Sequence, residues 1–136
     1  MGSLAFRKRD LGPFNRLAGF RVDSDLPTGF VRVSDNDYSN ISFDRGHLRN
    51  SKDRSNTAER NAVTFLMTNI LPQTADNNQG PWRIFETFEL DLANAGHELY
   101  IYAGAFGGTK RTANDKVVIP KTFWKSMVVI SKAMAT

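Results

Sequence analysis

The chain has 136 residues, with 18 Lys plus Arg against 14 Asp plus Glu, a net charge of +4 and a sequence pI of about 9.6. This length suits one domain that buries a core without staples, and the absence of cysteine excludes both disulfides and thiolate metal sites. No apolar run approaches the roughly 20 residues of a membrane span, and no signal peptide is expected at this N-terminus. The positive charge favours a polyanionic partner without requiring one.

The sequence predicts a single domain over residues 1–136, with residues 1–15 as an arm that packs over it. Residues 30–33 alternate between apolar and polar side chains and are bounded by turn-forming segments, which predicts a short strand. Residues 41–43 are expected to be extended and to lead into a turn at residues 44–47.

Two further elements are predicted before the middle of the chain. Asn56 and Glu59 form a capping pair, so residues 58–62 should make one or two helical turns. The β-branched and apolar run at residues 63–68 predicts a buried strand that Pro72 closes.

A longer helix is expected to begin near Asn77 or Asn78, because Pro81 is tolerated only within about the first helical turn. Gly96 should end it. Its expected buried face comprises four residues at helical spacing: Trp82, Phe85, Phe88 and Leu92. Strands are predicted at residues 98–102, 117–119 and 127–130, with a Gly-rich loop at 104–115 and a turn at 120–124. The order of elements predicts an α+β domain.

The most informative pattern is the tetrapeptide Asp44-Arg45-Gly46-His47, with Asn78 thirty-one residues after the histidine and Glu86 eight residues after Asn78. Hydrolysis of a phosphodiester needs a base for water and cations against the added charge. His47 can be that base, since an ordinary imidazole is mostly neutral at pH 7. Asn78 could be a weak Mg²⁺ ligand, and Glu86, roughly 12 Å further along a helix, could bind metal-bound water.

Each residue of this pattern also has an ordinary structural interpretation. A single histidine is usually a surface residue or a satisfied core residue, Asn77 and Asn78 could cap a helix, and Glu86 could be a solvated carboxylate. Three cations fit either a phosphate groove or a solvated face: Lys52, Arg54 and Arg60.

The tetrapeptide, the segments 64–74 and 76–78, and Trp82 together resemble the DNA/RNA non-specific endonucleases of the ββα-metal, or His-Me finger, superfamily. The likeness extends from about Arg16 to Lys125. It implies a compact α+β fold with a central antiparallel sheet and a long metal-site helix. It also implies a Mg²⁺-dependent endonuclease, with Mn²⁺ as a substitute, that cuts single- and double-stranded DNA and RNA to 5′-phosphate products.

The same resemblance implies a role for each site residue. His47 matches the general base, Asn78 the direct metal ligand, and Glu86 the carboxylate on metal-bound water. Three more residues match supporting positions: Arg16 against the transition-state charge, Arg45 near the scissile phosphate, and Asn69 in support of the site.

Two departures from the family pattern bear on activity. Many members have Pro in place of Asn50 and a further active-site Arg in place of Leu90, and loss of that cation would lower turnover or shift substrate preference. Two alternatives therefore stay open: a catalytically weak or inactive nucleic-acid-binding module, and the nuclease effector domain of a toxin or defence system with a proteinaceous inhibitor. A homodimer is a further alternative, no membrane partner is expected, and the family suggests a secreted or periplasmic protein.

Overall fold

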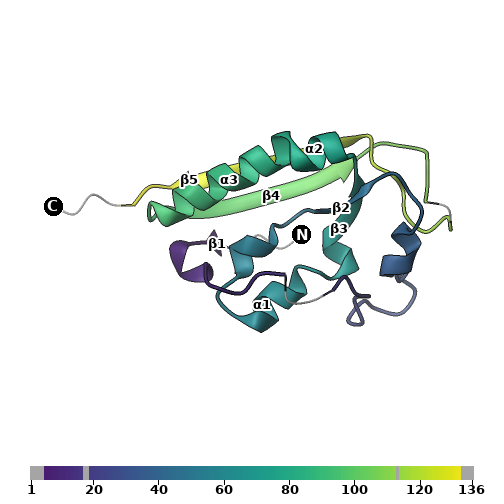
Figure 1. Cartoon of the computed structure of the whole chain (residues 1–136), viewed down its shortest axis with the longest axis horizontal. Coiled ribbons are helices and arrows are strands. Elements are labelled where there is room, and N and C mark those ends of the chain that lie inside the picture. Colours follow the sequence, from purple (N-terminus) through teal and green to yellow (C-terminus); the bar gives the residue numbers. More distant parts are fainter. Residues whose placement is uncertain (1–4, 17–18, 113, 133–136) are drawn as a thin grey trace.

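The computed structural model describes residues 5–16, 19–112 and 114–132 (Figure 1). Residues 1–4 of the predicted arm lie outside this range, and residues 5–15 contribute a strand and a 3-10 helix. The strands are β1 (Ala5–Phe6), β2 (Asp44–His47), β3 (Ile70–Gln73), β4 (Glu98–Phe106) and β5 (Thr122–Ile130). The α-helices are α1 (Ala58–Val63), α2 (Ala75–Gln79) and α3 (Pro81–Asn94). The 3-10 helices are η1 (Lys8–Asp10), η2 (Asp35–Tyr38), η3 (Ser51–Arg54) and η4 (Met67–Asn69).

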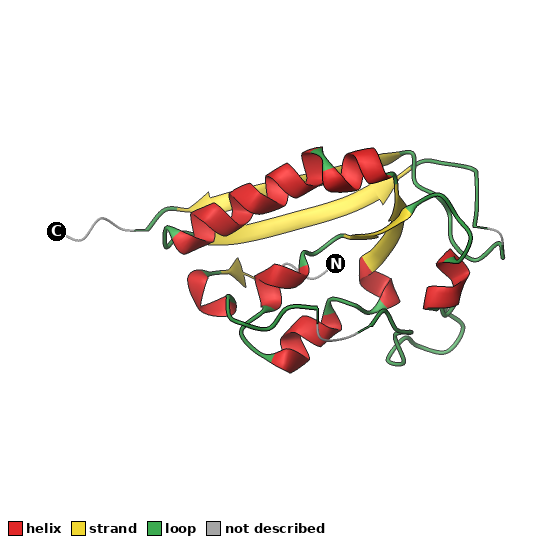
Figure 2. Ribbon diagram, viewed as in Figure 1, coloured by secondary structure: helices red, strands yellow, loops and turns green. Residues whose placement is uncertain are grey.

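The strands form two antiparallel sheets (Figure 2). The larger has the order β1-β4-β5, and α3 packs along its long β4–β5 hairpin. The smaller sheet is the β2–β3 ribbon, with Asp44 opposite Gln73 and His47 opposite Ile70. Among the described residues, no helix has the length and apolar character needed to cross a bilayer.

The core consists of two apolar clusters. One, between α3 and the larger sheet, contains Phe6, Ala93 and Leu99, all 0% exposed. The other surrounds β3 and contains Tyr38, Met67, Ile70 and Val117. Burial of these side chains is the main favourable contribution to folding, and it holds α3 on the larger sheet and η2 against β3.

The predicted long helix is two helices, because Gly80 separates α2 from α3 and Pro81 starts α3 at its first position. The predicted buried face is also partly wrong. Trp82 is buried, but Phe88 is 52% exposed, and the buried positions of α3 are Trp82, Glu89 and Ala93. Glu89 of this face meets a lysine of the sheet, Lys125, a polar contact that the apolar pattern could not indicate.

Three predicted strands are wrong. Phe30 and Val31 lie in an irregular segment and are each 62% exposed. Residues 63–68 finish α1 and enter η4, so β3 starts only at Ile70 and includes Pro72. Residues 117–119 make a single bridge, between Val118 and Arg111. In each case the local pattern was apolar or alternating, but a strand also needs a partner edge, which local sequence does not supply.

The other predicted elements are confirmed with shifted bounds. The helix α1 forms, although Thr57, not Asn56, is its N-cap, because the Thr57 hydroxyl accepts from the backbone N–H of Arg60. Gly96, at φ +98°, follows α3 as expected. The strands predicted at 98–102 and 127–130 are the beginning and end of a longer hairpin, and the turn expected at 120–124 becomes strand from Thr122.

Gly46 lies within strand β2, not in the expected turn, and it makes room for a buried side chain. A Cβ at this position would lie 2.1 Å from Oε1 of Gln73, which is 1% exposed. Gly46→Ala is therefore expected to destabilise the fold by about 1–3 kcal/mol, since the core must shift to admit the methyl group.

Thermal unfolding measures this effect, with Gly19→Ala as the matched control, because no atom of the described residues lies within 4 Å of a Cβ at Gly19. Equal melting temperatures for the two variants would show that Gln73 does not confine Gly46.

Candidate functional site

A cavity of about 440 Å³ lies where β2, α2, α3 and η3 meet. It gathers five of the six predicted site residues, namely Arg16, Arg45, His47, Asn78 and Glu86. The other residues that line it are Asn15, Asn50, Ser51, Lys52, Gln79, Arg83, Thr87 and Leu90. Asn69, the sixth, does not line the cavity.

His47 ends strand β2 with its ring against aromatic side chains. The ring lies 5.0 Å from that of Phe65, edge to face, and 5.7 Å from that of Phe20. Its Nε2 is buried and makes no hydrogen bond with the residues that the structure describes. Burial, with the charges of Arg16 and Lys125, lowers the pKa of His47 to about 4. The imidazole is therefore neutral at pH 7 and able to accept a proton.

We expect the His47 imidazole to remain neutral from pH 8 to about pH 5, because burial disfavours its charged form. Since its folded pKa lies below the unfolded value near 6.5, the unfolded state binds more protons between these two pH values. The folded state therefore loses stability as the pH falls from about 6.5 to about 4.

An NMR titration of the histidine ring signals measures this pKa, and the chain holds only two histidines. The His97→Ala variant assigns the His47 signal. A midpoint at pH 6.5 or above for His47 would contradict the burial argument.

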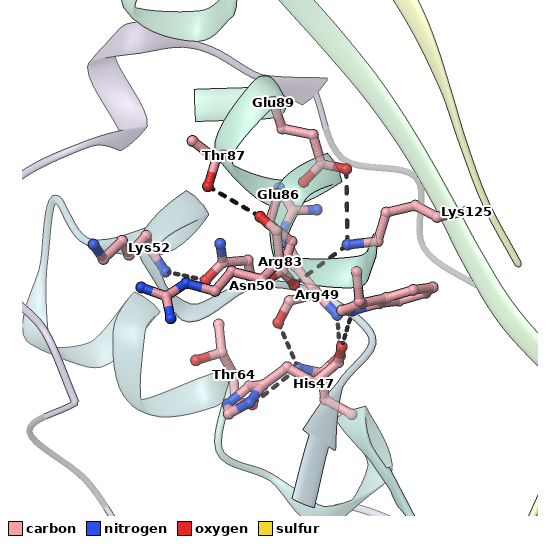
Figure 3. A network of polar contacts seen from close by, with 12 residues as sticks. His47, Arg49, Asn50, Lys52, Thr64, Arg83, Glu86, Thr87, Glu89 and Lys125 are labelled. Carbon is pink, nitrogen blue, oxygen red and sulfur yellow. Dashed lines mark hydrogen bonds and ion pairs between the residues drawn. The ribbon is translucent and has the colours of Figure 1, made fainter. Parts of the chain in front are cut away.

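The backbone around His47 is fixed from behind the cavity. Asn69 accepts from the backbone N–H of Arg49 through Oδ1 and donates from Nδ2 to the carbonyl oxygens of Arg49 and Thr64. The indole N–H of Trp82 donates to the carbonyl oxygen of His47 at 3.0 Å. Figure 3 shows Arg49 and Thr64 close to His47. Asn69 thus supports the end of β2 without facing the cavity.

Asp44 orients the amide of Asn78. Its Oδ2 accepts from Nδ2 of Asn78 at 2.8 Å and from Nε2 of Gln79 at 3.0 Å. The hydrogen bond from Gln79, followed by that from Asn78, lowers the pKa of Asp44. Asp44 is therefore an ionised carboxylate, which accepts hydrogen bonds but donates none. The NH₂ of Asn78 must therefore face Asp44, which leaves Oδ1 of Asn78 available to a cation.

Glu86 reaches the cavity from α3 and is held by a buried lysine of β5. Nζ of Lys125 lies 3.4 Å from Oε1 of Glu86 and 3.7 Å from Oε1 of Glu89 (Figure 3). Burial raises the pKa of Glu86, and the charge of Lys125 opposes this shift. Burial also raises the pKa of Glu89 to about 8. Glu89 is 0% exposed and does not line the cavity.

The cations of the cavity differ in how they are engaged. Nε and Nη2 of Arg45 donate to Asp35, and its guanidinium lies over the rings of Phe20 and Tyr38. By contrast, three cavity cations make no side-chain hydrogen bond or ion pair with the described part of the chain: Arg16, Lys52 and Arg83. Arg16 also has a left-handed backbone, with φ +50°, which is uncommon outside glycine.

Two residues of the site were not predicted from the sequence: Arg83, which lines the cavity, and Lys125, which contacts Glu86 from outside the lining. Lys125 falls next to a segment predicted as a turn, so its side chain could not be assigned to a face. Arg83 was detectable, because it precedes Glu86 by one helical turn and Leu90 by two. Leu90 lines the cavity at the position where the family resemblance implies a cation, so Arg83 is the positive side chain that α3 contributes there.

Together these residues offer a neutral base, an oriented amide oxygen, a carboxylate and several cations around one cavity. This set suits a phosphodiester, whose hydrolysis needs a proton acceptor and stabilisation of negative charge. Within the described ranges, no three His, Asp or Glu side chains cluster closely enough to enclose a metal ion. A hard, hydrated cation on a single amide oxygen fits this donor set.

Comparisons with known proteins agree with this chemistry. A family model described as DNA/RNA non-specific endonuclease matches residues 3–135. A nuclease from Nostoc sp. is 47% identical over 120 residues, which cover 88% of this chain and 44% of that protein. Human mitochondrial endonuclease G is 25% identical over 126 residues, which cover 84% of this chain and 42% of that protein. This chain therefore spans less than half the length of these two relatives.

A solved structure of the EndoG/EndoGI complex, described as showing the mechanism of EndoG inhibition, has a TM-score of 0.76 and 19% sequence identity. The match covers 90% of this chain and 57% of that one. This likeness confirms the predicted α+β, ββα-metal fold with its antiparallel sheets and helix.

Proposed function

Because the chain belongs to the DNA/RNA non-specific endonuclease family, we propose that it is a metal-dependent endonuclease of DNA and RNA. It would hydrolyse phosphodiester bonds in single and double strands and leave 5′-phosphate ends. The observation that carries this proposal is the neutral, buried imidazole of His47 in one cavity with Asn78 and Glu86.

Mg²⁺ is the proposed cofactor, with Mn²⁺ as a substitute. Asn78 would hold the ion directly through Oδ1, and Glu86 would hold it through water. When bound, the ion supplies positive charge to the phosphate and to the leaving 3′ oxygen. The ionised Asp44 supports this assignment, because it keeps the amide oxygen of Asn78 free of the hydrogen bond that would otherwise occupy it.

Side chains of the cavity and its support provide the remaining steps, which are proton transfer and stabilisation of charge. His47 accepts the proton of the attacking water at its imidazole, which is neutral at pH 7. The guanidinium of Arg16, which has no ion-pair partner among the described residues, stabilises the charge that develops on the phosphate. Arg45, held by Asp35, lines the same cavity, and Asn69 keeps the backbone of β2 in place. Contacts of this kind are made to the phosphate backbone and carry no base sequence.

Digestion of four substrates tests the proposal: single- and double-stranded DNA and single- and double-stranded RNA. With Mg²⁺, all four should be cut, and the new 5′ ends should accept label from polynucleotide kinase only after phosphatase treatment. Direct labelling without phosphatase would indicate 5′-hydroxyl products and contradict the proposed chemistry. A proteinaceous inhibitor and a homodimer stay predictions that this experiment does not address.

Asp44→Ala is expected to lower the affinity for Mn²⁺ by about 10–100-fold, because the Asn78 amide loses the partner that sets its orientation. Calorimetric titration with Mn²⁺ measures the affinity. Asp76→Ala is the matched control, since Asp76 is an exposed carboxylate on α2, the helix that carries Asn78. An equal loss of Mn²⁺ affinity in the two variants would show that the effect comes from the removal of a negative charge and not from the orientation of Asn78.

A further inference from the structure

Lys125 is a buried cation that the proposed mechanism does not yet use. Its side chain is 3% exposed, although lysine is seldom buried without a partner. Along β5 it shares a face with Phe123, whose ring contacts that of Trp82, and with Met127, which packs on the core. The ammonium group therefore points inward, toward α3.

Lys125 meets three side chains of α3 there. Its Nζ lies 3.4 Å from Oε1 of Glu86, 3.7 Å from Oε1 of Glu89 and 4.4 Å from the centre of the Trp82 ring. The shorter ion pair, which is also a hydrogen bond, is the one to Glu86, the only one of the three that lines the cavity. Figure 3 shows the ammonium between the two carboxylates.

These contacts continue to the general base. The indole N–H of Trp82 donates to the carbonyl oxygen of His47, and the face of the same indole lies under the ammonium of Lys125. One side chain of β5 thus links the strand that carries His47 to the carboxylate on α3.

We propose that Lys125 is a positioning residue that holds the Glu86 carboxylate at the wall of the cavity, at a fixed separation from His47. This inference rests on the proposed function, in which Glu86 acts on metal-bound water. Without this contact, the Glu86 carboxylate would occupy the productive position only part of the time. Small displacements of a catalytic group strongly reduce the rate of the chemical step.

Three variants separate positioning from a merely structural role: Lys125→Met, Lys125→Arg and the double variant Lys125→Met/Glu89→Gln. Lys125→Met removes the ammonium but keeps an apolar stem of similar length. The double variant also removes the buried carboxyl group of Glu89, which would otherwise lose its neighbouring ammonium. Each variant is compared with wild type for kcat, KM, Mn²⁺ affinity and melting temperature.

Lys125→Met should lower kcat by about 10–100-fold and weaken Mn²⁺ binding, with a much smaller change in KM for DNA. Lys125→Arg should recover part of kcat. The double variant should regain melting temperature while kcat and Mn²⁺ affinity stay low.

Wild-type kcat and Mn²⁺ affinity in either Lys125→Met or the double variant would overturn the positioning role. Failure of the proposed function is a separate result, because it appears as a wild-type protein that does not cut nucleic acid. The positioning role is then judged on Mn²⁺ affinity alone, and a wild-type protein that binds no Mn²⁺ would overturn it too.

Discussion

His47→Ala is expected to slow phosphodiester cleavage by about 10²–10⁴-fold, the usual contribution of a general base, while the affinity for DNA stays near that of wild type. The expectation follows from a ring that is neutral at pH 7 and whose Nε2 has no hydrogen-bond partner among the described residues. The cavity cations Arg16, Lys52 and Arg83 remain in the variant and continue to bind phosphates.

Single-turnover cleavage of a labelled duplex measures the rate, and fluorescence anisotropy of the same duplex measures binding. His97→Ala is the matched control, because His97 is the other histidine of the chain and contacts the backbone of Lys132 away from the cavity. Added imidazole should restore part of the activity of His47→Ala and none to an inactive Asn78 variant. Activity within tenfold of wild type in His47→Ala would exclude His47 as the base.

Asn78→Ala is expected to weaken Mn²⁺ binding and cleavage by about 100-fold or more, because it removes the one oxygen that would bind the metal directly. Asn77→Ala is the control, since Asn77 is the neighbouring amide on α2 and does not line the cavity. Calorimetric titration with Mn²⁺ and the cleavage assay are run on the same samples.

A carboxylate at position 78 gives a sharper test of the Asp44 contact. Asn78→Asp should bind the metal more weakly than wild type, although carboxylates are good metal ligands. The substitution would place the new carboxylate directly against that of Asp44. The exchange Asp44→Asn/Asn78→Asp should recover at least part of the metal binding. Full activity in Asn78→Asp alone would show that Asp44 does not orient residue 78.

The structure brings most of the predicted site residues to one cavity, whereas several of the predicted elements between them differ from those observed. His47, Asn78 and Glu86 form a spaced pattern, and the structure brings all three to one cavity, whatever the secondary structure between them. The single helix expected to carry Asn78 and Glu86 is broken at Gly80. The eight-residue spacing between Asn78 and Glu86 does not reveal this break.

What the sequence could not predict depends on contacts between distant residues. Gly46 seemed to serve a turn, but its role is set by Gln73 on the neighbouring strand. Lys125 and Glu89 are polar residues in buried positions, and only their pairing across β5 and α3 makes such burial tolerable. Phe30 and Val31 show the reverse case, in which an alternating pattern finds no neighbouring strand among the described residues.

Digestion of supercoiled plasmid by the purified protein, in Mg²⁺ and in excess EDTA, tests the central claim most directly. A nuclease site built on Asn78, Glu86 and His47 predicts nicking followed by linearisation with Mg²⁺ and intact plasmid with EDTA. Cutting that persists in EDTA would contradict the metal site. A folded protein that retards the plasmid in a gel but leaves it uncut in Mg²⁺ would contradict the nuclease itself and favour a binding module.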